Sequence, residues 1–167
     1  RTRIWALESV EMRNQLVDLR FSLKISEQDK IYWPHNTQVS VLFTLGDTLS
    51  ISLVNTNLGD ETVTLTQALH TYFPIDDIHQ LKASGFSGSK YIEFAEGPYP
   101  QTTDEVRFDR ETDRVYTELG PVQLLHTPQG IIEVSRENSQ SAVLWNPWIE
   151  KSQRLGRFNP EDYQTMV

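Results

Sequence analysis

Residues 15–25 read QLVDLRFSLKI, and from Val17 onward they alternate without interruption between apolar and polar side chains. In an extended chain Leu19, Phe21 and Leu23 face one side, while Asp18 and Arg20 face the other. A period of two with one polar face is typical of an antiparallel strand that has one face in a core and the other in water. The stretch therefore predicts a half-buried antiparallel strand.

Most of the remaining chain repeats this pattern in shorter pieces. Residues 39–44 and 48–54 alternate on either side of a turn at Gly46 and Asp47, and residues 57–60 form the next turn. Residues 62–73 form the longest alternating run, which we expect to be a strand ended by Pro74, since proline cannot donate to a sheet ladder. Further strand candidates are residues 91–94, 106–108, 114–116, 122–125, 131–134 and 142–145. Many short strands at near-regular spacing favour an all-β sandwich, with residues 1–167 as a single domain.

Signals for other structure are few. Asn159 and Pro160 resemble a helix N-cap and a proline at the first helical position, which predicts one short helix or turn through Tyr163. Residues 84–89 and 96–103 are rich in glycine, serine or proline and are expected to form a loop and an exposed connection.

The overall composition excludes several classes of function. The chain has 167 residues, a net charge of −8 and no cysteine. The negative charge argues against nucleic acid or an anionic membrane as the main partner, although a local arginine cluster could still bind a phosphorylated small molecule. Without cysteine no disulfide or thiolate metal site can form within the chain. No apolar run is long enough to span a membrane and no signal peptide is visible, so we expect a cytoplasmic protein.

His70 is the first candidate for chemistry. Residues 67–73 read QALHTYF, and the alternation places His70 beside Tyr72 on the polar side of the expected strand. Histidine can give or take a proton near neutral pH. A hydrogen-bonded structural role is the simpler interpretation of a histidine considered alone, so the neighbouring segments decide its role.

Two other segments allow both a structural and a functional interpretation. Residues 108–116 read FDRETDRVY, which is either a solvated loop with weak ion pairs or a source of carboxylates for sugar hydroxyls. Residues 143–148 read VLWNPW, which is either core packing around an Asn-Pro turn or an aromatic wall beside a carbohydrate ring. The four histidines do not fall at metal-ligand spacings, so no metal site is predicted.

An ordered set of these segments resembles a known family. The set comprises ALHTYF at 68–73, DI at 77–78, TDRVY at 112–116, WNPW at 145–148 and YQTMV at 163–167, with RTRIW at 1–5 and YWPH at 32–35. In this order the segments resemble the hexose-phosphate mutarotase branch of the aldose 1-epimerase family, whose members are also called glucose-6-phosphate 1-epimerases.

The resemblance implies a fold, a reaction and roles for individual residues. The implied fold is the galactose mutarotase-like β-supersandwich, and the implied isomerase reaction interconverts the α and β anomers of a hexose 6-phosphate in carbohydrate metabolism. His70 would be the general acid that protonates the ring oxygen. Asp113 would bind sugar hydroxyls, Arg1 would lie at the substrate site near the phosphate, and Trp145 would contact the sugar. No metal or organic cofactor is implied, and we expect a monomer or weak oligomer.

The ends of the chain depart from the family pattern. The family's catalytic glutamate falls a few residues beyond Val167, and its first strands would precede Arg1. We therefore expect a sandwich that is incomplete at both termini, and a chain that lacks the base and is inactive or nearly so by itself. The alternative interpretation is a non-catalytic carbohydrate-binding β-sandwich.

Overall fold

The computed structural model describes residues 3–156 and 159–167. Chain contacts divide the protein into two compact units, Arg1–Ala68 (unit 1) and Leu69–Val167 (unit 2). Twelve strands, one α-helix and two 3₁₀ helices make up the described part of the chain, so the expected all-β class is confirmed. The expectation of a single domain over residues 1–167 stays a prediction.

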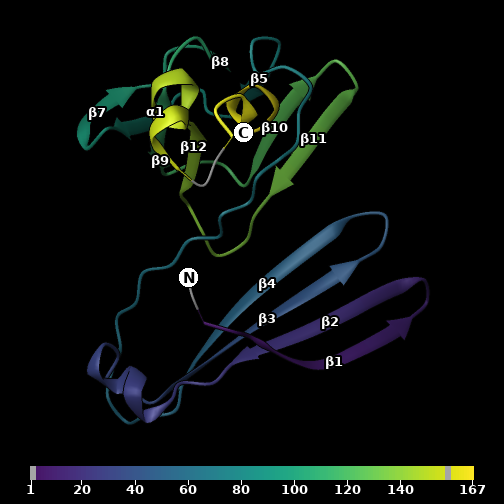
Figure 1. Cartoon of the computed structure of the whole chain (residues 1–167), viewed down its shortest axis with the longest axis vertical. Helices are drawn as coiled ribbons and strands as arrows, with labels where there is room; N and C mark the ends of the chain where they lie inside the picture. The colour runs from purple at the N-terminus through teal and green to yellow at the C-terminus, as the bar shows by residue number, and fades with distance from the viewer. Residues whose placement is uncertain (1–2, 157–158) are drawn as a thin grey trace. The chain divides into compact units, whose positions relative to one another are not determined.

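Unit 1 contains one four-stranded antiparallel sheet in which the strands pair in chain order (Figure 1). Its strands are β1 (Ala6–Arg13), β2 (Leu16–Leu23), β3 (Thr37–Leu45) and β4 (Leu49–Asn57), with the 3₁₀ helix η1 (Glu27–Ile31) between β2 and β3. The strands predicted at residues 15–25, 39–44 and 48–54 are confirmed.

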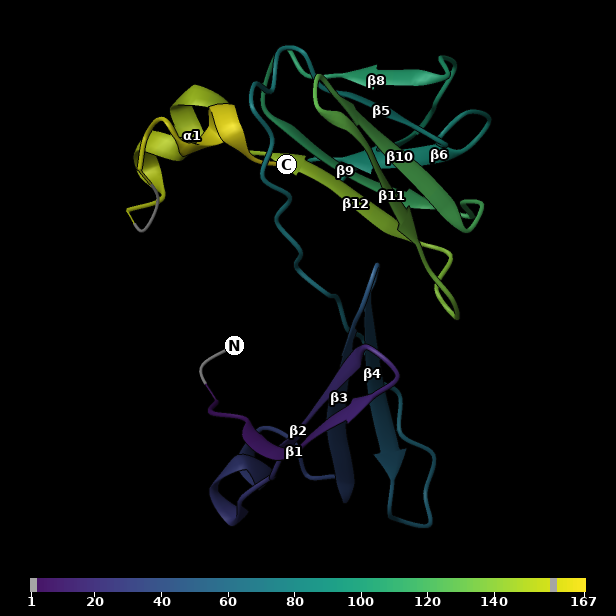
Figure 2. The same ribbon diagram turned by 90° about the vertical axis from the view of Figure 1, so that its right-hand side faces the viewer.

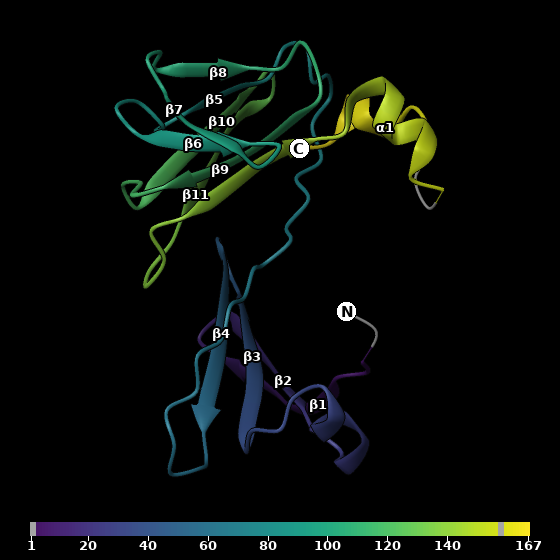
Figure 3. The same cartoon turned by 90° about the vertical axis from the view of Figure 1, so that its left-hand side faces the viewer.

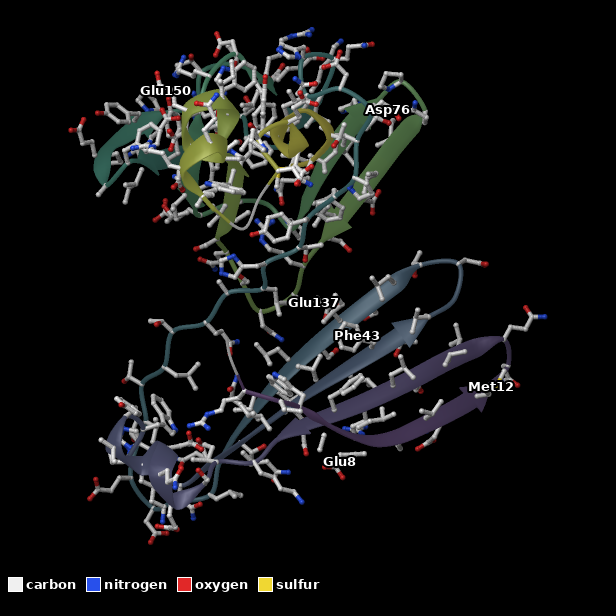
Figure 4. The ribbon with its side chains drawn as sticks, viewed as in Figure 1. Glu8, Met12, Phe43, Asp76, Glu137 and Glu150 are labelled. Atoms are coloured by element: carbon white, nitrogen blue, oxygen red, sulfur yellow. The ribbon has the colours of Figure 1, made fainter. Side chains whose placement is uncertain are left out.

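The register of this sheet gathers its apolar side chains on one face. Leu19 on β2 pairs with Phe43 on β3, and Phe43 pairs with Ile51 on β4. The rings of Phe21 and Phe43 meet edge to face with centroids 5.8 Å apart. Figure 4 labels Phe43 on β3 and Met12 near the far end of β1. The alternation of residues 15–25 therefore continues across the sheet as rows of like side chains.

Unit 2 contains two four-stranded antiparallel sheets, of order β11-β10-β5-β8 and β12-β9-β6-β7 (Figures 2 and 3). The strands are β5 (Lys82–Ser84), β6 (Lys90–Glu93), β7 (Glu96–Pro100), β8 (Glu105–Arg107), β9 (Thr112–Thr117), β10 (Val122–Thr127), β11 (Gly130–Ser135) and β12 (Ala142–Asn146). The helix α1 (Trp148–Arg154) and the 3₁₀ helix η2 (Asp162–Thr165) follow β12. The short strand candidates from residue 91 onward are thus confirmed, with small differences in their ends.

Both sheets of unit 2 supply its core. Ala83 on β5 and Leu125 on β10 are buried together with Tyr116 on β9 and Leu144 on β12. The Tyr116 ring is fully buried, and its hydroxyl donates to Oε1 of Gln101 at 2.8 Å. Unit 2 is therefore a β-sandwich in which each sheet has one face in the core.

The prediction of a strand over residues 62–73 is wrong. This segment pairs with no strand in the described chain, and ladder-like bonding begins only at its end. There the N–H of Phe73 donates to the carbonyl of Val167 at 2.8 Å, the N–H of Val167 donates back at 3.2 Å, and Pro74 bridges Met166. An alternating pattern indicates which side each residue faces in an extended chain. It does not provide the neighbouring strand whose hydrogen bonds make a sheet.

Two further expectations need correction. Residues 96–103 were expected to form an exposed connection, but β7 begins at Glu96 and pairs with β6 as an exposed edge strand. Pro98 and Pro100 are tolerated there because an edge strand is bonded on one side only. Helix α1 was not predicted, since Asn146 and Pro147 were interpreted as a turn.

The predicted helix signal at residues 159–163 is confirmed in part. The N–H of Asp162 donates to the carbonyl of Asn159 at 3.0 Å, which closes a turn, and η2 begins at Asp162 rather than at Pro160.

Gly85, at the end of β5, offers a test of the packing between β5 and β10. It has φ +89°, and a Cβ there would lie 2.6 Å from the carbonyl oxygen of Val122. Gly88 has φ +75°, but a Cβ there would meet nothing within 4 Å. Both Gly→Ala changes incur a left-handed backbone penalty of about 1 kcal/mol. We expect Gly85→Ala to lower the free energy of unfolding by about 3 kcal/mol, because overpacking against backbone adds to that penalty. Urea denaturation of both variants checks this, and equal losses would contradict it.

Candidate active site

Asp113 and Trp145 lie opposite one another on neighbouring strands. Trp145 of β12 and Asp113 of β9 are register partners, as are Leu144 and Arg114 one residue along. Leu144 faces the core of unit 2. Because successive residues of a strand face opposite sides, Asp113 and Trp145 project from the other face of the same sheet. Two residues that are 32 positions apart in the chain are thereby neighbours on one surface.

Lys151 of α1 completes this pair. Its Nζ lies 2.8 Å from Oε1 of Glu111, 3.6 Å from Oδ2 of Asp113 and 5.8 Å from the centroid of the Trp145 ring. A separation within about 6 Å allows a cation–π attraction between ammonium and ring. Figure 4 labels Glu150, the residue before Lys151, on α1. The corner formed by Glu111, Asp113, Trp145 and Lys151 is partly exposed, with 37% of the Asp113 side chain open to solvent.

The segment that carries His70 reaches the same corner. The ring of Tyr72 meets Trp145 edge on, with centroids 6.1 Å apart and planes at 82°. Tyr72 is exposed, as is His70 two residues earlier in the chain. Tyr72, Glu111, Asp113, Trp145 and Lys151 therefore form one group of side chains in unit 2, which we call the Trp145 corner. His70 belongs to the chain segment that leads into it.

A buried asparagine fixes the position of α1, and with it that of Lys151. Asn146 is fully buried, and its Nδ2 donates to the carbonyls of Tyr163 at 2.8 Å and Met166 at 2.9 Å. Its Oδ1 accepts the backbone N–H of Trp148 at 2.9 Å. The Trp148 ring in turn packs on Tyr163 with centroids 5.4 Å apart. One side chain thus ties the end of β12 to the start of α1 and to the last turn of the chain.

Asp77 and His79 support α1 from another side. His79 Nδ1 lies 2.8 Å from Oδ1 of Asp77, and the His79 and Trp148 rings are in contact with their centroids 5.1 Å apart. The side-chain hydrogen bond from Gln80, followed by the backbone and side-chain bonds from His79, lowers the pKa of Asp77 to about 2. The Asp77 carboxylate accepts hydrogen bonds from His79 and Gln80 in its own turn. A structural role therefore explains why Asp77 is among the residues that resemble the family.

Arg114, the residue after Asp113 on β9, lies on the opposite face of the sheet and is held there by two contacts. Its Nε donates to Oε1 of Glu93 at 3.0 Å, and its guanidinium lies 4.5 Å from the centre of the Tyr91 ring. Both charged side chains of this pair are largely buried. The charged stretch at residues 108–116 is therefore divided between the two faces. Arg114 contributes to the interior, while Glu111 and Asp113 contribute to the Trp145 corner.

The sequence-predicted residues have different outcomes. Asp113 and Trp145 are brought together, while Arg1 lies outside the described residues. Lys151 was missed, and Glu111 was covered only as part of the charged stretch at residues 108–116. The helix that carries Lys151 was not predicted, and a lysine three residues after a Trp-Asn-Pro-Trp segment gives no signal by itself. Within the described residues, no group of three or more histidine, aspartate or glutamate side chains is placed to hold a metal ion. The same residues include no helix long and apolar enough to cross a membrane.

Comparison with known proteins shows where this arrangement belongs. The sequence model of the family described as aldose 1-epimerase matches residues 1–167, the whole chain. The chain belongs to the aldose 1-epimerase family. A relative in Salmonella typhimurium, named "Putative glucose-6-phosphate 1-epimerase", is 32% identical over 167 residues, which are 98% of this chain and 55% of that protein. A relative of the same name in Cenchrus ciliaris is 29% identical over 154 residues, covering 87% of this chain and 46% of that protein.

Solved structures agree with this membership of the aldose 1-epimerase family. A crystal structure described as a "putative mutarotase" from Salmonella typhimurium is 30% identical and has a TM-score of 0.86, covering 98% of this chain and 55% of that one. The expected mutarotase-type β-sandwich fold is therefore confirmed. The chain spans about half the length of the curated relatives it matches.

Proposed function

We propose that the complete protein interconverts the α and β anomers of a hexose 6-phosphate, with His70 as general acid and the Trp145 corner as the sugar-binding site. The observation that carries the proposal is the contact between Tyr72 and Trp145, with centroids 6.1 Å apart. It brings the His70 segment to a surface where an aromatic ring and a carboxylate are register partners. The names of the Salmonella typhimurium and Cenchrus ciliaris relatives support the choice of substrate class.

The reaction needs two proton transfers on one pyranose ring. His70 gives a proton to the ring oxygen while a base, expected from the family resemblance to be a glutamate, removes the proton of the C1 hydroxyl. The bond between C1 and the ring oxygen breaks, and C1 becomes an aldehyde. Rotation about the C1–C2 bond then presents the other carbonyl face, and ring closure returns both protons with the roles reversed. No atom is gained or lost, so no co-reactant is required.

The Trp145 corner has the groups that hold a sugar in place. A pyranose has an apolar face of C–H groups that suits an aromatic ring, and hydroxyls that suit carboxylates. The apolar surface beside Trp145 continues along the same face, where Val143 of β12 pairs with Val115 of β9 and Val115 pairs with Ile92 of β6. Asp113 stands at the edge of this surface and can accept hydrogen bonds from hydroxyl groups.

The phosphate requires a cationic partner of its own. Arg1 is the residue we propose for it, because a guanidinium donates two parallel hydrogen bonds to phosphate oxygens. Arg1 lies outside the described residues, so its assignment depends on the family resemblance alone.

Anomer exchange measured by NMR on the complete protein tests the proposal. Glucose 6-phosphate is the substrate, and free glucose and galactose are run beside it. We expect exchange of the phosphorylated sugar well above the rate in buffer, and slower exchange of the free sugars. Exchange of the free sugars alone would transfer the proposal to unphosphorylated substrates. No acceleration for any sugar would overturn the enzyme and favour a carbohydrate-binding sandwich.

A further inference from the structure

We infer that Lys151 is a specificity-determining residue, which together with Asp113 recognises two neighbouring hydroxyl groups of the bound sugar. This inference rests on the proposed function, because it takes the Trp145 corner to be the sugar site. It adds a residue that is separate from the proton-transfer step and assigns it a definite chemical task.

The hydrogen-bonding capacity of Lys151 is only partly used within the described structure. An ammonium group has three N–H donors and no acceptor. One donor is satisfied by Glu111, whose Oε1 lies 2.8 Å away. The 3.6 Å separation from Asp113 is too long for a hydrogen bond, although the two charges attract. Two donors therefore remain for a ligand or for water.

Asp113 has the complementary capacity. A carboxylate accepts hydrogen bonds at two oxygens and donates none when ionised. Among the residues that the structure describes, no hydrogen bond is found to either Asp113 oxygen, and its one ion-pair partner is Lys151. An acceptor with open sites thus stands beside a donor with open sites, next to the Trp145 ring.

Such a pair suits adjacent hydroxyls on a pyranose ring. Each hydroxyl can donate one hydrogen bond and accept others. One hydroxyl can donate to Asp113 while its neighbour accepts from Lys151, with the C–H face of the ring over Trp145. This arrangement requires both hydroxyls to point toward the same corner, so it selects the configuration of the ring as well as the presence of the groups.

The position of Lys151 is set by the protein rather than by the ligand. Helix α1 is held at its start by the buried Asn146 side chain, through the N–H of Trp148 at 2.9 Å. The ammonium is held at its tip by Glu111 at 2.8 Å. Because the start of helix α1 and the ammonium group of Lys151 are both held in place before the sugar binds, the Lys151 side chain loses less conformational freedom on binding.

The test combines variants of Lys151 with deoxy substrates on the complete protein. Lys151→Met keeps the length of the side chain and removes its charge and its hydrogen-bond donors. Lys151→Arg keeps the positive charge and the hydrogen-bond donors. Lys90→Met is the matched control, because Lys90 is an exposed lysine on β6. Michaelis constants and turnover numbers are measured by NMR anomer exchange for glucose 6-phosphate and for its 2-, 3- and 4-deoxy analogues.

We expect Lys151→Met to raise KM roughly 10- to 100-fold with little change in kcat, the range for a lost hydrogen bond to a charged group. Lys151→Arg should lose less, and Lys90→Met nothing. In the wild type one deoxy analogue should show a similar rise in KM, and in Lys151→Met that same analogue should show no further rise. Such non-additivity identifies the hydroxyl that Lys151 contacts. An unchanged KM in Lys151→Met, or additive effects for every analogue, would overturn the inference.

Failure of the proposed function leaves a different signature. If the wild type does not accelerate exchange, the enzyme proposal fails, and binding of 1,5-anhydroglucitol 6-phosphate, which has no anomeric hydroxyl, then decides the role of Lys151. Weaker binding to Lys151→Met than to Lys90→Met would support the inference. Equal binding, or none to the wild type, would overturn it.

Discussion

Replacing His70 by glutamine is expected to slow anomer exchange of glucose 6-phosphate roughly 10²- to 10⁴-fold, the usual contribution of one positioned acid or base. Glutamine keeps a polar side chain of similar reach and cannot deliver a proton at neutral pH. Ring opening would then rely on water as the acid. Binding should survive, because the residues proposed to hold the sugar are elsewhere in unit 2.

The control for this variant is a histidine outside the proposed site. His126 lies on β10, in the other sheet of unit 2 from Asp113 and Trp145, with its Nε2 2.8 Å from Oγ of Ser84, so His126→Gln should leave exchange unchanged. Binding of 1,5-anhydroglucitol 6-phosphate separates lost chemistry from lost affinity, since this analogue cannot open at C1. Exchange by His70→Gln at more than about a tenth of the wild-type rate would place the acid elsewhere, given the effects typical of general acids. Loss of binding in parallel with loss of exchange would make His70 a substrate-binding residue.

The fold could be predicted where local pattern and pairing coincide. Strand β2 pairs with a strand on each side and has one apolar face. The alternation in residues 15–25 therefore corresponds directly to a strand of the sheet. Residues 62–73 alternate over most of their length, with polar Gln67 and Thr71 on the otherwise apolar side, yet no strand in the described chain pairs with them. A period of two reports the direction of side chains and leaves the hydrogen-bonding partner open. Strand β7 was missed because its prolines argue against a strand. They are tolerated there because β7 is an edge strand that is hydrogen-bonded on one side only.

The candidate site could be predicted only in part. Asp113 and Trp145 each allowed a structural or a functional interpretation, because the register that joins them connects residues far apart in the chain. Lys151 has no sequence signal, since its role depends on a helix of seven residues that is held by tertiary contacts. Short helices of this kind are stabilised by packing rather than by propensity, so they are poorly visible in a sequence.

Asn146 is the residue on which this tertiary support depends most, and Asn146→Ala is expected to lower the free energy of unfolding by at least about 3 kcal/mol. The amide satisfies three backbone groups, namely the carbonyls of Tyr163 and Met166 and the N–H of Trp148. Alanine would leave all three in a site where the native side chain is fully buried. Each unsatisfied buried polar group costs about 1–3 kcal/mol, and water that enters the cavity would recover part of this.

Two further variants make the Asn146 prediction specific. Asn146→Asp keeps the volume and the acceptor for Trp148, but it replaces two donors by an oxygen that faces two carbonyls. It should therefore destabilise the protein at neutral pH about as much as alanine does. Asn55→Ala removes an exposed side-chain hydrogen bond to Gln67 and should cost about 1 kcal/mol or less. Urea denaturation measures all three. A loss in Asn146→Ala no greater than in Asn55→Ala would mean that α1 is held by its ring contacts instead. Under native conditions Asn146→Ala should also raise KM for the sugar phosphate, because Lys151 then loses the fixed helix that positions it.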